Sequence, residues 1–177
     1  MQKKCILSAQ DIARTLERLA CEVLERHGDA DNLALVGIQR RGVDIAGRLR
    51  GLLSARLGRE VALGSLDINL YRDDWTSLDT QPMINRTELP FAVDDARIVL
   101  VDDVLYTGRT IRSALEAILD YGRPERVELL VLVDRGHREL PIHADYVGKS
   151  LTTGRDEQVN VLVSERDGDD AVMLLRR

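Results

Sequence analysis

Residues 97–110 read Arg97-Ile98-Val99-Leu100-Val101-Asp102-Asp103-Val104-Leu105-Tyr106-Thr107-Gly108-Arg109-Thr110 and give the clearest indication of the fold. Residues 97–101 form a short apolar run, which predicts a buried strand that ends at two carboxylates, Asp102 and Asp103. Residues 107–110 are expected to open a helix, because apolar side chains recur at helical spacing over residues 111–119. A strand, a polar turn and a helix in this order are typical of an open α/β sheet, which binds ligands beyond the carboxyl ends of its parallel strands.

Strand-like and helix-like segments alternate on both sides of this unit, which predicts an α/β fold with a mainly parallel, twisted sheet flanked by helices. Ser8, followed three residues later by Asp11, marks the start of the first helix. Gly122 and Pro124 are expected to end the helix that follows the central strand. The other expected elements are a strand over 33–36, a helix over 43–53, extended chain over 61–71, and strands over 127–133, 144–147, 159–163 and 171–175. Neither a repeat nor a linker interrupts this order, so residues 1–177 are predicted to form one domain.

The connection over residues 72–95 differs from the rest of the chain. It is polar, contains two prolines and shows no clear period, although residues 77–81 are predicted to form a turn. Connections of this length in a compact domain are usually functional or mobile, so this segment is expected to serve the site.

Composition narrows the class of protein. The 177 residues, 44% apolar and 31% charged, are typical of a soluble globular domain with a full core. No apolar run approaches the roughly 20 residues of a membrane span, and the N-terminus does not resemble a signal peptide, so a cytoplasmic location is expected. Cys5 and Cys21 are expected to be buried or half-buried reduced thiols, and no cysteine or histidine has metal-ligand spacing. The net charge of −5 argues against a general nucleic-acid binder but leaves room for a local basic face.

The turn after the central strand has the chemistry of a ribose 5-phosphate site. Backbone N–H groups at a helix N-terminus attract an anion, and Gly108 lets the backbone approach a phosphate closely. The hydroxyls of Thr107 and Thr110 can donate further hydrogen bonds, while Asp102 and Asp103 can accept hydrogen bonds from vicinal hydroxyls. An ordinary strand–turn–helix corner explains a single acid here, but not two adjacent acids followed by T-G-x-T.

A second loop, Gly37-Ile38-Gln39-Arg40-Arg41-Gly42, lies between a predicted strand and a predicted helix. Two guanidinium groups beside backbone amides suit a pyrophosphate. Paired arginines alone are usually solvated surface residues. At the end of a second parallel strand, beside the first turn, Arg40 and Arg41 become candidate pyrophosphate ligands.

Residues 101–110 resemble the phosphoribosyl pyrophosphate motif of type I phosphoribosyltransferases, and the 37–42 loop resembles their pyrophosphate loop, which often holds a non-proline cis peptide. The resemblance implies that fold, with a small hood and a flexible loop. It also implies that Asp102 and Asp103 hold the ribose hydroxyls and that residues 106–110 hold the 5′-phosphate. The pyrophosphate is normally presented with Mg²⁺, which keeps several waters and needs few protein ligands. Asp102 and Asp103 are therefore the candidate Mg²⁺ ligands, directly or through water.

Two further stretches, residues 67–74 and 132–149, resemble one branch of these enzymes, the bifunctional pyrimidine operon attenuation regulators and uracil phosphoribosyltransferases. This resemblance implies transfer of the ribosyl group of phosphoribosyl pyrophosphate to uracil, giving UMP and pyrophosphate. It also implies that Asp134, Arg135 and the backbone near Val159 border the base. Purine-salvage relatives carry an acid where this chain has Tyr106, which argues against hypoxanthine or guanine as the substrate.

The resemblance places Arg72 and Arg86 near the pyrophosphate. Catalytic roles are expected for Asp102, Asp103, Arg40 and Arg41. The full set expected to bind phosphoribosyl pyrophosphate or UMP is Val101, Asp102, Asp103, Val104, Leu105, Tyr106, Thr107, Gly108, Arg109, Thr110, Arg40, Arg41, Arg72 and Arg86.

Regulatory members of this branch bind pyrimidine-operon leader RNA when UMP or UTP occupies the site, and act as dimers or higher oligomers. Arg14, Arg18 and Lys149 are the candidate RNA contacts, but Glu17 and nearby acids would weaken them, and simple helix solvation explains the arginines equally well. Two alternatives to the bifunctional protein therefore stay open, namely an enzyme that has lost RNA binding and a nucleotide-sensing regulator with weak catalysis. A different phosphoribosyltransferase is a third, less favoured reading.

Overall fold

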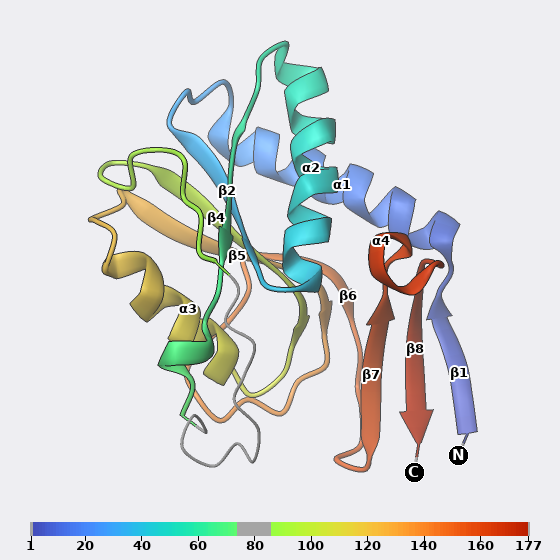
Figure 1. Ribbon diagram of the computed structural model, residues 1–177. Helices are drawn as coiled ribbons and strands as arrows, with labels where there is room; N and C mark the ends of the chain where they lie inside the picture. Colours follow the sequence, from blue (N-terminus) through green and yellow to red (C-terminus); the bar gives the residue numbers. More distant parts are fainter. Residues whose placement is uncertain (1, 74–85, 177) are drawn as a thin grey trace.

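The computed structural model describes residues 2–73 and 86–176 (Figure 1). The elements, in chain order, are β1 (Gln2–Leu7), α1 (Ala9–His27), β2 (Leu33–Ile38), α2 (Arg41–Leu57), β3 (Ala62–Leu66), the 3-10 turn η1 (Asn69–Tyr71), β4 (Arg97–Leu105), α3 (Arg109–Leu119), β5 (Arg126–Asp134), β6 (Tyr146–Ser150), β7 (Glu157–Leu162), α4 (Ser164–Asp167) and β8 (Ala171–Arg176).

The strands form two sheets. The larger sheet has five parallel strands in the order β3-β2-β4-β5-β6, and the smaller sheet has three antiparallel strands in the order β1-β8-β7. Helices α1 and α2 cover one face of the larger sheet and α3 covers the other, while the small sheet stands to one side with α4 at its end (Figure 1). The predicted α/β class, with a parallel sheet flanked by helices and a small hood, is confirmed.

The core divides because residues of β4 alternate between the two faces of the sheet. Val99 and Val101 pack with the α1 and α2 side, whereas Ile98 and Leu100 pack with α3. Both faces are covered, which is why β4 reads as a continuous apolar run in the sequence.

Helix α1 begins where the sequence predicted. The Ser8 hydroxyl accepts a hydrogen bond from the Asp11 N–H at 3.2 Å, and the Asp11 carboxylate accepts one from the Ser8 N–H at 2.9 Å. This reciprocal capping box satisfies two amides that the helix leaves unpaired.

Several predicted boundaries were wrong, for local reasons. Strand β4 continues beyond residue 101 to Leu105, because residues up to Leu105 pair with β5. Asp102 and Asp103 therefore lie within the strand. Helix α3 begins at Arg109 and ends at Leu119, before the predicted stop at Gly122. The extended segment 61–71 divides into β3 and η1, and β6 starts two residues later than predicted.

Two elements were not predicted. Strand β1 is exposed over its first four residues and lacks the apolar alternation that identifies a strand, and α4 is a single turn. The two cysteines are exposed, so the prediction of buried or half-buried thiols was wrong. The turn predicted at residues 77–81 lies outside the described residues.

Candidate active site

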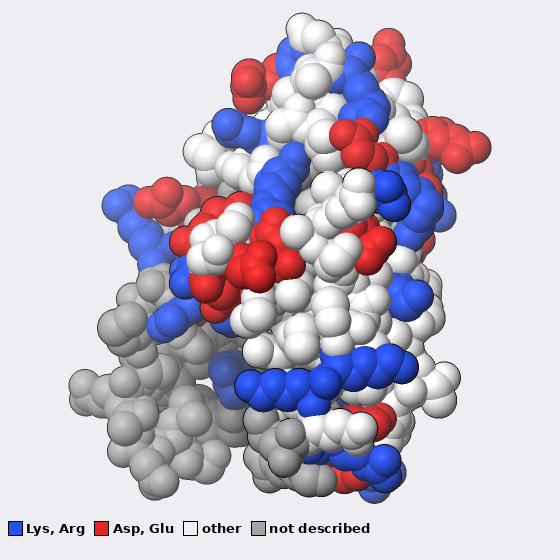
Figure 2. Space-filling view, turned by 90° about the vertical axis from the view of Figure 1, so that its right-hand side faces the viewer, with Lys and Arg blue, Asp and Glu red and all other residues white. Residues whose placement is uncertain are grey.

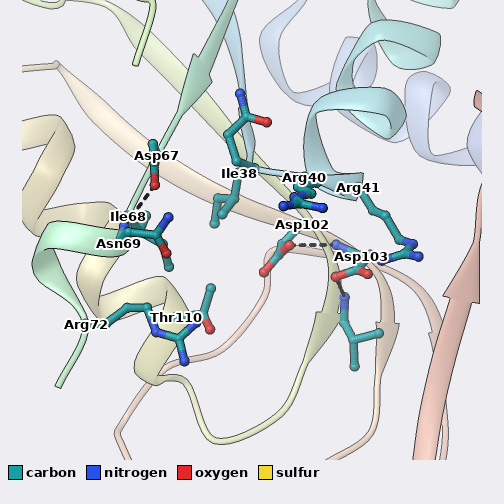
Figure 3. A pocket seen from close by; sticks show the side chains of 12 residues that line it. Ile38, Arg40, Arg41, Asp67, Ile68, Asn69, Arg72, Asp102, Asp103 and Thr110 are labelled. Carbon is teal, nitrogen blue, oxygen red and sulfur yellow. Dashed lines mark hydrogen bonds between the residues drawn. The ribbon is translucent and has the colours of Figure 1, made fainter. Parts of the chain in front are cut away.

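A polar cavity of about 470 Å³ opens at the carboxyl ends of β2, β3 and β4 (Figure 3). In Figure 3, Arg40 and Arg41 lie on one side of the two central carboxylates, and Asp67, Arg72 and Thr110 lie on the other. The full lining is Ile38, Gln39, Arg40, Arg41, Asp67, Ile68, Asn69, Arg72, Asp102, Asp103, Val104 and Thr110. The cavity thus brings together the two loops that the sequence singled out.

Asp102 and Asp103 form the floor of the cavity. Asp102 Oδ1 accepts a hydrogen bond from the Asp103 N–H at 2.9 Å, and Asp103 Oδ1 accepts one from the Val104 N–H at 2.8 Å. Burial, and then the neighbouring charge of Asp103, raise the pKa of Asp102 well above its ordinary value. Burial also raises the pKa of Asp103, although the Val104 N–H and Arg41 oppose this shift. Such a pair is suited to accept hydrogen bonds from a diol and to stabilise a nearby positive charge.

The turn after β4 presents the start of α3. Gly108 has a φ of 93°, a conformation that L side chains rarely adopt, and a Cβ there would lie 3.1 Å from Ile142. Thr110 lines the main cavity, while Thr107 and Tyr106 line an adjoining cavity of about 320 Å³. Because a helix N-terminus favours an anion, this end of α3 is a suitable place for a phosphate.

The Arg109 side chain points away from this role. Its guanidinium donates to Glu139 at 2.8 Å and to Asp73 at 2.8 Å. The Arg109 backbone N–H also has a partner, because it donates to Thr107 Oγ1 at 3.3 Å.

The predicted 37–42 loop was too long, because β2 extends to Ile38 and α2 begins at Arg41. This segment approaches the carboxylates closely. A Cβ on Gly42 would lie 2.5 Å from the carbonyl oxygen of Val101, so only glycine fits there without a shift. The peptide bond between Gln39 and Arg40 is cis, a feature that the resemblance associated with the pyrophosphate loop. Arg41 donates to Asp167 of α4 at 2.9 Å through Nη2 and at 3.3 Å through Nε.

Some predicted site residues do not line this cavity. The Arg86 side chain is 87% exposed and lies 3.8 Å from Glu88. Asp134 pairs with Arg138 at 2.6 Å. The Val159 side chain is buried in the core, although the prediction concerned its backbone.

Arg135 contacts the turn after β4 through the side chain of Tyr106. It is buried, donates to the carbonyl oxygen of Glu157 at 2.8 Å, and stacks its guanidinium 4.1 Å from the centre of the Tyr106 ring. Tyr106 also lines the cavity next to the main one, so Arg135 reaches the site through this ring.

The residues that follow β3 were not predicted to belong to the site. Asp67 is buried, its Oδ1 accepts the Asn69 N–H at 3.0 Å, and its Oδ2 has no hydrogen-bond partner among the described residues. The side chains of Asp67 and Asn69 both line the cavity. Their position after a third parallel strand was the available signal, because the carboxyl ends of neighbouring strands share one edge.

The candidate RNA contacts are on the surface, but they are partly engaged. Arg18 pairs with Glu22 and donates to the carbonyl oxygen of Gly148 at 2.6 Å. Arg14 and Lys149 are exposed. On the face drawn in Figure 2, acidic and basic side chains are mixed and do not separate into one basic patch.

Comparison with known proteins defines the class. Residues 3–165 match the phosphoribosyl transferase domain family, so the chain is a phosphoribosyltransferase-family protein. Solved hypoxanthine phosphoribosyltransferases share the fold. The enzyme from Staphylococcus aureus is 20% identical, with a TM-score of 0.67, and the match covers 98% of this chain and 92% of that one. The enzyme from Trypanosoma cruzi in complex with IMP is 15% identical, with a TM-score of 0.72, and the match covers 98% and 90%.

Within that class, the chain belongs to the PyrR family. The bifunctional protein PyrR of Syntrophobacter fumaroxidans is 56% identical over 97% of this chain and 92% of its own length. The protein of the same name from Deinococcus radiodurans is 55% identical over 97% and 94%. The resemblance drawn from residues 67–74, 101–110 and 132–149 is therefore confirmed. No helix in residues 2–73 and 86–176 is long and apolar enough to cross a membrane.

Proposed function

We propose that the protein transfers the ribosyl group of phosphoribosyl pyrophosphate to uracil, releasing pyrophosphate, and that it also regulates pyrimidine-operon expression through leader RNA. The observation that carries the enzymatic part is the single cavity that joins the Asp102–Asp103 pair, the Arg40–Arg41 loop and Thr110 at the start of α3. These groups match, in order, a ribose diol, a pyrophosphate and a 5′-phosphate.

The chemistry follows from what each group can stabilise. Transfer at the anomeric carbon passes through an oxocarbenium-like state, so positive charge develops on the ribose while negative charge develops on the leaving pyrophosphate. Asp102 and Asp103 lie where they can hold the ribose and stabilise the positive charge. Arg40 and Arg41 lie where they can stabilise the negative charge of the leaving pyrophosphate. Arg72 lines the cavity on the other side of the two carboxylates. Holding both ends fixes the sugar for in-line attack by the base.

Mg²⁺ fits the same cavity as a companion of the pyrophosphate. The described residues contain no group of three or more histidine, cysteine or carboxylate side chains that could hold a metal ion. An ion carried mainly by substrate phosphates and water needs no such group, and Asp102 and Asp103 would contact it directly or through water. The ion would neutralise charge on the leaving pyrophosphate.

The base is proposed to lie on the Tyr106 side of the ribose. Tyr106 takes the place of the acid that purine-salvage relatives use, and Arg135 stacks on its ring. Asp134 and Arg135, together with the backbone near Val159, are proposed to border uracil. Arg86 is also proposed to approach the pyrophosphate.

Regulation requires a surface that senses the occupied site. Lys149 is exposed on β6 and Arg14 is exposed on α1, and these two elements pack together. We propose that they contribute to an RNA-binding face in a homodimer or higher oligomer, with UMP or UTP as the sensed ligand. Glu17, which pairs with Arg56, limits the basic charge of this face.

Two assays test the proposal. Uracil-dependent release of pyrophosphate should be measured for the wild-type chain and for Asp102→Asn combined with Asp103→Asn, which should stay folded and inactive. Full activity of the double variant, or no UMP formation by the wild-type chain, would refute the enzymatic part.

The second assay measures binding to pyrimidine-operon leader RNA with and without UMP across a salt series. Specific binding should strengthen with UMP and weaken with salt. Activity without RNA binding would favour the enzyme-only alternative, and UMP-dependent RNA binding with negligible turnover would favour the sensor alternative.

A further inference from the structure

Helix α4 connects the small sheet to the Arg40–Arg41 loop. Asp167, the last residue of α4, accepts two hydrogen bonds from the Arg41 guanidinium, at 2.9 Å on Oδ1 and 3.3 Å on Oδ2. The preceding residue, Arg166, pairs with Asp44 and donates to the carbonyl oxygen of Arg40 at 3.4 Å. Two neighbouring side chains of α4 therefore hold the loop that lines the cavity.

The Asp167 carboxylate also has a backbone partner that helps to fix its position. Its Oδ2 also accepts the Val163 N–H at 2.8 Å, and its side chain is 20% exposed. The hydrogen bond to Arg41, and then that from Val163, lower the pKa of Asp167, so this carboxylate is ionised at neutral pH. A carboxylate that is held by the Val163 N–H and contacts Arg41 through both oxygens fixes the plane of the guanidinium.

Two other acids also act on Arg41. The charges of Asp103, which belongs to the ribose-binding pair, and of Asp44 contribute to raising the pKa of the Arg41 guanidinium. Without Asp167, the guanidinium would lose the partner that fixes its position and could turn toward these other acids. That move would withdraw the cation that the pyrophosphate needs.

We propose that Asp167 is a positioning residue that holds the Arg41 guanidinium in place for the pyrophosphate group of the substrate. This inference rests on the proposed function, in which Arg41 binds the diphosphate end of phosphoribosyl pyrophosphate. Ligands with a diphosphate should depend on Asp167. A nucleoside monophosphate, whose phosphate lies at the start of α3, should not.

The test compares two ligands in two variants. Asp167→Asn keeps the size of the side chain and one acceptor oxygen but removes the charge. Asp156→Asn is the matched control, because Asp156 makes an exposed ion pair with Arg176 of the same small sheet, at 3.4 Å. Calorimetric binding of inorganic pyrophosphate with Mg²⁺ should weaken roughly ten-fold in Asp167→Asn, the equivalent of one bidentate charged contact, and stay within about two-fold in the control. UMP binding should stay within about two-fold in both variants.

Two results would overturn the inference. Unchanged pyrophosphate binding in Asp167→Asn would show that Arg41 does not need its partner. Equal weakening of pyrophosphate and UMP would show that the substitution damages the fold rather than the position of one side chain.

A double-mutant cycle separates action through Arg41 from independent action. In an Arg41→Gln background, Asp167→Asn should cause no further loss of pyrophosphate affinity, and a further loss of roughly ten-fold would overturn the proposal. Because these are binding measurements, they stand apart from turnover. A wild-type chain that binds pyrophosphate through Asp167 but makes no UMP would refute the proposed function alone.

Discussion

Asp102→Asn is expected to stabilise the protein while it destroys the activity. The carboxylate is 7% exposed and lies next to a second acid, and both conditions raise its pKa. The amide keeps the oxygen that accepts the Asp103 N–H at 2.9 Å. The substitution therefore removes the buried charge and leaves the hydrogen bond in place.

The expected gain depends on pH. A carboxyl group whose pKa is raised by folding binds its proton more tightly in the folded chain, so wild-type stability falls as pH rises from the unfolded pKa of about 3.9 through the folded pKa. The advantage of the variant should be small near pH 4 and should grow toward neutral pH. A gain of about 1 kcal/mol is expected there, which in a chain of 177 residues raises the Tm by about 2–4 °C.

The assay is thermal unfolding of both proteins between about pH 4 and about pH 8, with no ligand present. Asp31→Asn, at an exposed aspartate, is the control and should not change the Tm appreciably at any pH. A lower Tm for Asp102→Asn at neutral pH, or a difference that does not change with pH, would refute the argument that burial of the ionised Asp102 carboxylate destabilises the wild-type protein.

Three further predictions concern other parts of the chain. Gly42→Ala should destabilise the protein by about 1–3 kcal/mol and weaken pyrophosphate binding, because its Cβ would meet the Val101 carbonyl oxygen at 2.5 Å; unchanged calorimetry and unfolding would contradict this. Glu128→Ala should cost about 1–3 kcal/mol in urea unfolding for each buried group that it leaves without a partner, namely the Tyr146 hydroxyl, now 2.6 Å from the carboxylate, and the His27 ring nitrogen. A loss below about 1 kcal/mol would show that water replaces the carboxylate. Arg135→Ala should raise the KM for uracil more than the KM for phosphoribosyl pyrophosphate, and the reverse order would place the base elsewhere.

The parts of the fold that the sequence predicted are those with a strong local signal. Strand β4 is buried on both faces, and α1 carries both residues of its capping box, so each could be identified from a few neighbouring residues. The end of β4 was misplaced because its last residues pair with β5, a contact that is not local. Strand β1 gave no signal, since its edge position leaves its first four side chains exposed.

The candidate site divides in the same way. The two acids and two arginines follow their strands directly, so topology alone brings them to one cavity. Asp167 is 126 residues from Arg41, and its short helix has no sequence pattern, so their pairing could be found only in three dimensions. The cis bond before Arg40 likewise leaves no mark on residue type.

The order of strands in the small sheet determines when that sheet can form during translation. Strand β8 lies between β1 and β7 yet follows both in the chain, so neither can gain its partner until residues 171–176 have left the ribosome. All five strands of the larger sheet emerge earlier. The acidic floor of the cavity can thus assemble during synthesis, whereas the small sheet that carries α4 is completed only by the last strand. A nascent chain would acquire its ribose-binding acids before it acquires a fixed Arg41.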